Sequence, residues 1–263
     1  MKKLLSFILC ALLLASCGTN PKSVEPAITV PATTTESPTA APTENTIIST
    51  TPPTEPVHST LYISMLDVED VIDWFNEVCL GAEFVNSGDP SFLQKWDRTI
   101  SYMVHGDPTD DDLATLESFT QWLNTVNGFP GIIETEDPLE ANLNIHFCTQ
   151  LEMLSKMGDW AHDLDGAVTF WYEDNRIYDA TICIRTDLSQ HLRNSVIMEE
   201  LYNGLGPIQD TSLRPDSIIY AEFSESQELT ETDKLILQLL YHPQMQCGMN
   251  ADQCEEVIRM LYY

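Results

Sequence analysis

A change in composition near residue 58 limits how much of this chain can fold. Residues 18–58 are rich in Thr, Pro, Ser and Ala and contain almost no large apolar side chains. Such a segment cannot bury enough apolar surface to offset the conformational entropy lost on folding, so we expect a disordered, extended tether. From Leu61 onward the composition is globular, and roughly 200 residues are enough for a single domain with its own core. We therefore place one folded domain at residues 59–263.

The start of the chain predicts a targeting segment. Two lysines precede the apolar run Leu4–Leu14, which is shorter than a membrane-spanning helix needs. The tetrapeptide Leu14-Ala-Ser-Cys17 then matches the bacterial lipobox, in which cleavage leaves a lipid-modified cysteine at the new N-terminus. We interpret residues 1–16 as a lipoprotein signal peptide and residues 17–58 as lipidated Cys17 with its tether. The expected location is the extracytoplasmic face of the cell membrane, to which the lipid anchors the protein.

The acidic composition argues against two classes of partner. Lys and Arg number 12 against 41 Asp and Glu, which gives a formal net charge of −29. Such a surface repels nucleic acid and anionic lipid. Solubility at a cell surface is the simpler explanation of the charge, and uptake of divalent cations by clustered carboxylates is the alternative. The cluster at Asp107 and Asp110–Asp112 lacks the spacing of an EF-hand and is typical of a helix N-terminus.

Five cysteines fall within the predicted domain, so at least one is free or pairs between chains. Cys247 and Cys254 flank the start of a predicted helix and could form a disulfide. Cys148 and Cys183 lie in two strand-like runs and could do the same if the strands are neighbours. Together with Cys79, we interpret all five first as core residues and second as disulfide partners.

Hydrophobic periodicity predicts both helices and strands in the domain. We expect helices over residues 66–79, 110–126, 151–157, 189–204, 229–241 and 250–261. We expect strands over residues 99–105, 142–148, 167–172 and 177–185. The last two strands form either a hairpin or neighbours in a mixed sheet. The prediction is an α+β fold with a sheet of about four strands and helices packed on it.

The stretch Val196–Asp210 contains the predicted functional site, with the sequence V-I-M-E-E-L-Y-N-G-L-G-P-I-Q-D. Glu199 and Asn203 are four residues apart and therefore lie on one face of the predicted helix. Glu200 follows directly, and Gly206 permits a sharp turn after the helix.

The layout resembles the zinc-peptidase motif of the metzincins, H-E-x-x-H-x-x-G-x-x-H-D, in which histidines bind zinc and the glutamate activates a zinc-bound water. The positions that agree are Glu200, Gly206 and Asp210. The three histidine positions hold Glu199, Asn203 and Gln209. One carboxylate and two amides make a poor zinc site, because zinc prefers imidazole and thiolate. We expect no cofactor, with a divalent cation as the alternative, and the general-base position of Glu200 makes it the catalytic candidate.

The sequence after the helix makes the resemblance more specific. Asp216-Ser-Ile-Ile-Tyr220 and the helix that begins near Leu229 resemble the Met-turn and C-terminal helix of a matrixin-type metzincin, with Ser217 in the turn and Ile219 in place of its methionine. A closer resemblance is to a bacterial domain family of unknown function allied to the metzincins. Its helix reads E-E-L-x-Q-x-L-G-L-x-N-D, followed by a serine–isoleucine turn, an L-T-x-x-D helix and an L-Y-x-P-x-x-x-x-G-M tail. This chain differs at Asn203 and Gln209, which are also carboxamides.

The resemblance covers nearly all of the predicted domain and implies a zincin-like α+β fold, with an active-site-like helix and C-terminal helices around a mixed sheet. The loss of the histidines leads us to expect a non-catalytic binding or accessory module, whose cleft beside Glu199 takes a peptide or protein ligand. The alternative is an unconventional metallopeptidase that uses Glu199 and Glu200 with a cation other than zinc.

Overall fold

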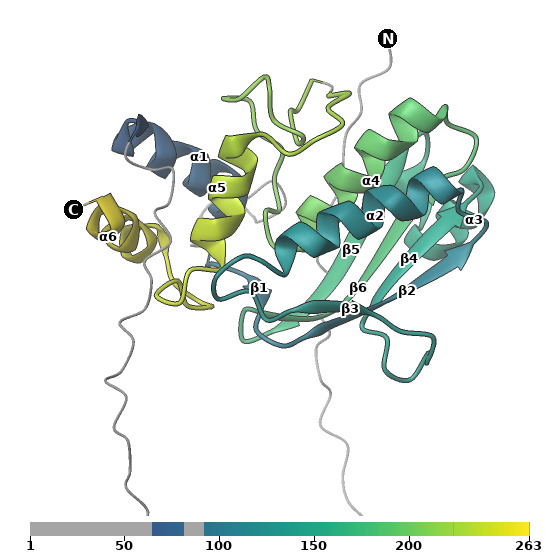
Figure 1. Cartoon of the computed structure of the whole chain (residues 1–263), viewed down its shortest axis with the longest axis horizontal. Helices are drawn as coiled ribbons and strands as arrows, with labels where there is room; N and C mark the ends of the chain where they lie inside the picture. The colour runs from purple at the N-terminus through teal and green to yellow at the C-terminus, as the bar shows by residue number, and fades with distance from the viewer. Residues whose placement is uncertain (1–64, 82–91, 223, 263) are drawn as a thin grey trace, which may run out of the picture. The chain divides into compact units, whose positions relative to one another are not determined.

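The computed structural model describes residues 65–81, 92–222 and 224–262, whose helices and strands are coloured in Figure 1. The predicted signal peptide at 1–16, the lipid site at Cys17 and the tether at 17–58 lie outside the described residues. Among the helices of the described part, none is both long and apolar enough to cross a membrane.

A six-stranded mixed sheet forms the centre of the domain. Its strands are β1 (Lys95–Trp96), β2 (Ile100–Gly106), β3 (Ile132–Glu134), β4 (Leu143–Cys148), β5 (Gly166–Glu173) and β6 (Arg176–Arg185). The order across the sheet is β1-β6-β4-β2-β3, and β5 also pairs with β6. Strand β5 is antiparallel to β6, whereas all the other pairings of the described strands are parallel.

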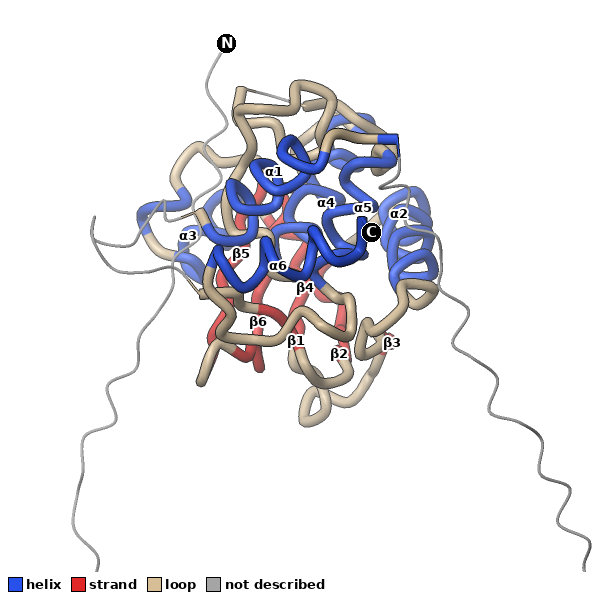
Figure 2. The backbone as a smooth tube through the Cα atoms, turned by 90° about the vertical axis from the view of Figure 1, so that its left-hand side faces the viewer, coloured by secondary structure: helices blue, strands red, loops and turns tan. Residues whose placement is uncertain are grey.

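Six α-helices surround this sheet in the described part of the chain. They are α1 (Val68–Leu80), α2 (Asp110–Leu123), α3 (Gln150–Met157), α4 (Gln190–Gly204), α5 (Glu231–Leu240) and α6 (Ala251–Tyr262). Helices α2 and α4 run side by side over one face of the sheet, and α1, α5 and α6 gather at one end (Figures 1 and 2). The main core lies between the sheet and these helices. A smaller core lies under α3 and includes Cys148, Cys183 and Ala167.

The helix ends follow from local sequence. Ser, Thr and Asn side chains accept hydrogen bonds from backbone N–H groups that the first helical turn leaves without partners. The capping residues are Thr109 for α2, Thr149 for α3, Ser189 for α4, Thr230 for α5 and Asn250 for α6. The aspartate cluster is confirmed as a helix start, because α2 begins at Asp110. The β5–β6 turn is a hairpin whose two central residues have positive φ angles, as type I′ turns require.

Six predicted helices and four predicted strands are confirmed, but the expected number of strands was too low. Strand β1 has two residues and β3 has three. Neither is long enough to show the alternation of apolar and polar residues that identifies a strand. Both exist because they pair with neighbours, β1 with β6 and β3 with β2. The five domain cysteines are free thiols.

Candidate functional site

Helix α4 carries the first part of the predicted site and is buried along most of its length. Every residue from Ser195 to Gly204 is buried, because the helix packs against β5 and β6 and also against α2. Glu199 is 7% exposed, Glu200 1% and Asn203 0%. Glu199, Glu200 and Asn203 are therefore inside the protein.

Glu200, the predicted general base, packs against strand β5. A Cβ atom on Gly166 would lie 2.7 Å from both Cγ and Oε1 of Glu200. Only a glycine at the start of β5 leaves room for this side chain. A general base must lie within hydrogen-bonding reach of the proton that it removes. In this arrangement Glu200 of α4 faces strand β5 of the central sheet.

Glu199 lies in a group of carboxylates. Burial raises the pKa of Glu199 well above the usual value for a glutamate, and the charges of Glu200, Asp210 and Asp165 raise it further. A buried carboxyl surrounded by other acids favours its neutral form. Such a residue is a poor ligand for a cation at neutral pH unless the cation itself displaces the proton.

Asn203, in the second ligand position, is enclosed without a hydrogen-bonding partner among the described residues. Neither its Oδ1 nor its Nδ2 makes a hydrogen bond there. Buried side-chain amides in native proteins usually have partners, because an unsatisfied buried polar group costs roughly 1–3 kcal/mol. At 0% exposure, this amide is out of contact with solvent.

The turn after α4 forms as predicted, and it places Gln209, the residue in the third ligand position, against α1. Gly206 has a φ of +131°, and a Cβ there would lie 2.6 Å from the carbonyl oxygen of Gln94. The backbone N–H of Gln209 then donates to the carbonyl oxygen of Val78 over 3.3 Å. A Cβ on Gly81 would overlap Oε1 of Gln209. The side chain of Gln209 therefore packs against the C-terminal end of α1.

The serine–isoleucine turn is held by one residue of α5. Ser217 Oγ donates to Asp233 Oδ1 over 2.6 Å, and the backbone N–H of Ile218 donates to Asp233 Oδ2 over 3.1 Å. Arg214 adds a buried ion pair to the same carboxylate, with Nη1 2.9 Å from Oδ1. Ile219 is 1% exposed and belongs to the main core. Asp233 therefore connects the turn to the L-T-x-x-D helix.

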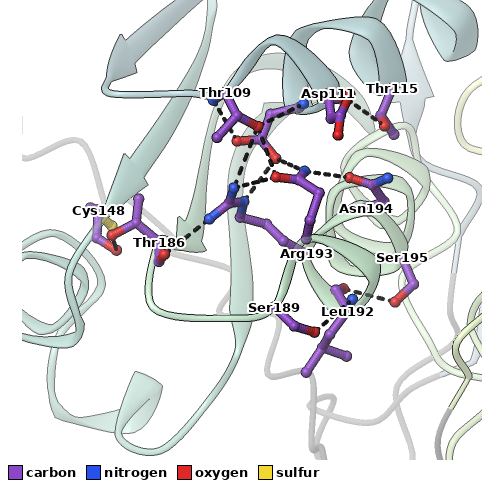
Figure 3. Close-up of polar contacts among 12 residues, drawn as sticks. Thr109, Asp111, Thr115, Cys148, Thr186, Ser189, Leu192, Arg193, Asn194 and Ser195 are labelled. Atoms are coloured by element: carbon purple, nitrogen blue, oxygen red, sulfur yellow. Dashed lines mark hydrogen bonds and ion pairs between the residues drawn. The ribbon is translucent and has the colours of Figure 1, made fainter.

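A second buried ion pair joins α2 to the start of α4 (Figure 3). Arg193 Nε lies 2.8 Å from Asp112 Oδ1, and its Nη1 donates to the carbonyl oxygen of Thr186. Gln190 bridges the pair, because its Oε1 accepts from Arg193 Nη2 and its Nε2 donates to Asp112 Oδ1. Hydrogen bonds from Thr109, Arg193 and Gln190 lower the pKa of Asp112 although burial acts to raise it. This network sets the position of α4.

A cavity of about 520 Å³ opens between α2, α4 and the segment before α5. Its walls include Phe119, Trp122, Met198 and Leu229, together with the carboxylates of Asp111 and Glu228. Met198 precedes Glu200 by two residues and so points to the opposite side of α4. The cavity is therefore on the other side of this helix from the predicted site.

The sequence interpretation missed several residues that shape this region, namely Gly166, Arg193, Arg214 and Asp233. Asp233 carried a signal, since Thr and Asp three residues apart predict a helix start. Its hydrogen bonds to the turn had no such signal, because they join segments that only the fold brings together. In the part of the chain that the structure describes, no group of three or more His, Cys, Asp or Glu is arranged to hold a metal ion.

Comparison with known proteins gives a family without an assigned activity. No curated protein matches the chain. Residues 69–260 match a protein family, and the matched region runs from α1 to α6. The expectation of a family of unknown function is confirmed at that level. Because the match covers most of its length, the chain belongs to the family described as "Protein of unknown function (DUF2927)".

Proposed function

We propose that this protein is a lipid-anchored, extracytoplasmic protein whose zincin-like domain has no zinc site and serves as a non-catalytic binding or accessory module. The observation that carries this proposal is the burial of Glu200 against Gly166. The residue in the general-base position has no route to a substrate in that arrangement. A metallopeptidase would need this carboxylate beside a metal-bound water.

The ligand positions support the same proposal. Zinc sites use imidazole, thiolate or carboxylate donors, and structural or catalytic zinc keeps at least three protein ligands. Glu199 is a buried acid with a raised pKa, Asn203 is a buried amide, and Gln209 packs against α1. This set gives neither zinc nor calcium a suitable coordination shell.

The zincin-like part of the proposal rests on how the motifs connect. The helix with paired glutamates is followed by the Gly206 turn, and the serine–isoleucine turn is bonded to the L-T-x-x-D helix through Asp233. In a protein that has lost its catalytic ligands, such connections retain the shape of the fold. Binding then depends on other surfaces.

We place the binding surface at the cavity between α2 and α4, with a cationic segment of a peptide or protein as its occupant. Trp122 and Phe119 offer aromatic faces, and Asp111 and Glu228 offer negative charge beside them. Aromatic rings and carboxylates together favour ammonium and guanidinium groups. The one cationic wall residue, Lys234, is paired with Glu231 at 2.8 Å. The formal charge of −29 would attract a basic partner.

The proposed lack of catalysis is tested by incubating the full-length chain with a mixed peptide library. The chain is purified in detergent without chelator. We expect no cleavage products by mass spectrometry, with or without added divalent cations. Cleavage that disappears in Glu200→Gln would overturn the proposal. The variant Glu255→Gln, at a half-exposed carboxylate of α6, is the matched control for the loss of one acid.

The binding part is tested with lysine-rich and glutamate-rich peptides of equal length, using the fluorescence of the tryptophans as the readout. We expect the lysine-rich peptide alone to bind, and Asp111→Asn combined with Glu228→Gln to weaken it about fivefold or more. Asp252→Asn, on the exposed side of α6, should leave the affinity unchanged. Equal binding of both peptides, or of neither, contradicts the proposal.

The membrane anchor is tested separately, in cells given a labelled fatty acid. The wild-type protein should carry the label and sediment with membranes. Cys17→Ser should lose the label and the membrane association, whereas Cys10→Ser, inside the predicted signal peptide, should keep both.

A further inference from the structure

The edge of the sheet opposite β5 is only partly filled. Strand β3 pairs with the first three residues of β2, Ile100–Tyr102, whereas β2 continues to Gly106 (Figure 1). On its other side β2 pairs with β4 from Tyr102 to Gly106. The second half of β2 therefore has a neighbouring strand on one side, and its other side is a strand edge.

The hydrogen bonds of β2 show which backbone groups point out of this edge. The N–H of Ile100 donates to the carbonyl oxygen of Gly131, and the carbonyl oxygen of Tyr102 accepts from the N–H of Thr135, each over 2.9 Å. Backbone groups alternate sides along a strand, so Val104 is the next residue that points toward the line of β3. Among the backbone bonds of the described residues, none joins Val104 to the segment after β3. Its N–H and carbonyl groups are therefore placed to pair with an added strand.

A pocket of about 460 Å³ lies beside this open edge, between β2 and α2. Its apolar wall consists of Val104 of β2 with Leu113 and Leu116 of α2. Glu117 and Glu134 add two carboxylates, and no Lys or Arg is among its described wall residues. Neither carboxylate takes part in an ion pair in the described part of the chain. The pocket thus combines apolar surface with negative charge that no neighbouring cation balances.

A strand added beside Val104 would place one side chain in this pocket. Residues that pair across two strands have their side chains on the same face of the sheet, and Val104 packs against the main core on the face that α2 covers. Glu134 pairs with Tyr102, two positions earlier, and so lies on that face as well. A lysine or arginine suits this position, because its methylene groups cover apolar surface while its charge reaches a carboxylate.

Charge distinguishes the possible occupants of the edge. A second copy of this chain would bring a formal charge of −29 against an equal charge, which opposes association. The predicted tether at residues 18–58 contains a single Lys or Arg, Lys22. A basic segment of another protein matches the two carboxylates of the pocket and is drawn toward the acidic domain.

We propose that the open edge of β2 at Val104 binds an extended, basic segment of a partner protein, which adds a strand beyond β3 and places a Lys or Arg side chain in the pocket between β2 and α2. In this mode of recognition the main-chain hydrogen bonds give affinity, and the pocket for an alternate side chain gives specificity. The pocket shares no wall residue with the cavity between α2 and α4. Neither proposal depends on the other.

The test is an NMR titration of the full-length, nitrogen-15-labelled chain in detergent, followed at the backbone amides of Met103–His105. The probe is the blocked peptide acetyl-Thr-Val-Lys-Val-Thr-amide, and the same peptide with glutamate in place of lysine is its control. We expect the lysine peptide alone to shift these signals and to slow hydrogen exchange of the Val104 N–H by at least about tenfold. Equal shifts with both peptides, or with neither, overturn the proposal.

The contribution of the pocket is measured with paired variants. Glu117→Gln combined with Glu134→Gln should weaken binding of the lysine peptide at these amides about fivefold. The matched control removes two carboxylates elsewhere, Glu173→Gln at the exposed end of β5 and Glu255→Gln on α6. It should bind like the wild type. Equal weakening in both double variants contradicts recognition in this pocket.

N-methylated peptides test the pairing of backbones. In a parallel added strand the N–H of the valine after the lysine donates to the carbonyl oxygen of Val104, whereas in an antiparallel strand the lysine N–H does so. Methylation of one of these two nitrogens should abolish binding, and methylation of the other should leave it intact. Binding that survives both methylations, or is lost with both, rules out strand addition.

The open N–H is tested in the protein itself. Val104→Pro removes this donor at a position where proline is tolerated, because the N–H faces away from β4. We expect binding to weaken at least about fivefold, while Val104→Thr, which keeps the N–H, should bind like the wild type. If Val104→Pro does not fold, hydrogen exchange of the wild type decides. Strong protection of the Val104 N–H before any peptide is added would show that the edge is already covered and would overturn the proposal.

Discussion

The side chain of Glu200 lies against the Cα atom of Gly166, where a Cβ would come within 2.7 Å of two of its atoms. The two residues are 34 positions apart in the sequence and meet because α4 packs across β5. This contact encloses the carboxylate in the general-base position and makes a single hydrogen atom of Gly166 essential to the packing of α4.

We therefore expect Gly166→Ala to destabilise the domain by about 1–3 kcal/mol, because the added methyl group must displace Glu200 or shift α4. The free energy of unfolding from urea titration measures this effect. Gly204→Ala is the matched control on the same helix–strand contact. Its Cβ would lie 3.4 Å from Val168, which is ordinary contact, so its stability should equal or exceed that of the wild type. If both variants lose a similar amount of stability, the contact of Gly166 with Glu200 does not account for the effect.

The buried ion pair between Arg193 and Asp112 should contribute strongly to the stability of the fold. Arg193→Met leaves the Asp112 carboxylate buried without its cation, and we expect a loss of about 3–5 kcal/mol. Arg259→Met, which removes an exposed ion pair with Glu69, should change stability far less. Chemical denaturation of the three proteins at neutral pH provides the comparison. Equal effects at the buried and exposed sites would argue against the network as the anchor of α4.

The raised pKa of Glu199 predicts an unusual dependence of stability on pH. Its pKa is raised in the folded state by burial and by Glu200, Asp210 and Asp165, so the native state holds this proton at pH values where the unfolded chain has lost it. The retained proton stabilises the fold at acidic pH. This stabilisation declines as the pH rises above about 4.3, the pKa of a glutamate in the unfolded chain. Glu199→Gln should remove the decline and increase stability near neutral pH.

Unfolding temperatures of the wild type and Glu199→Gln between acidic and neutral pH test this sign. The difference between the two proteins should grow as pH rises. Glu255→Gln, at a half-exposed site, should give a curve parallel to that of the wild type. A Glu199→Gln variant that is less stable than the wild type at neutral pH would show that a bound cation or another partner keeps the carboxylate charged.

Asp233 should matter more than an ordinary capping residue. It completes the capping box of α5 and also bonds to Ser217, Ile218 and Arg214. Asp233→Ala should therefore cost about 3 kcal/mol or more, since it leaves Arg214 buried and unpaired. Thr149→Ala removes only the cap of α3 and should cost about 1 kcal/mol. Urea denaturation midpoints of the two variants test the difference.

The long elements were predictable because their evidence is local. The hairpin of β5 and β6 shows strand alternation on both sides of a turn, and α4 begins at a serine cap and ends before a glycine turn. Strand β1 was not predictable, because its two residues become a strand only through pairing with β6. The positions of Glu199 and Asn203 on one helical face followed from their spacing, but their burial did not.

The sequence by itself determined the order of helices and strands, the glycine turn after α4 and the replacement of all three histidines, since each depends on residues close together in the chain. The tertiary structure decided which of these residues can act. Only packing between distant segments places Glu200 against Gly166, directs Gln209 to the end of α1 and brings Cys148 and Cys183 into one small core. Access to a side chain depends on what covers it, and the covering residues come from elsewhere in the sequence.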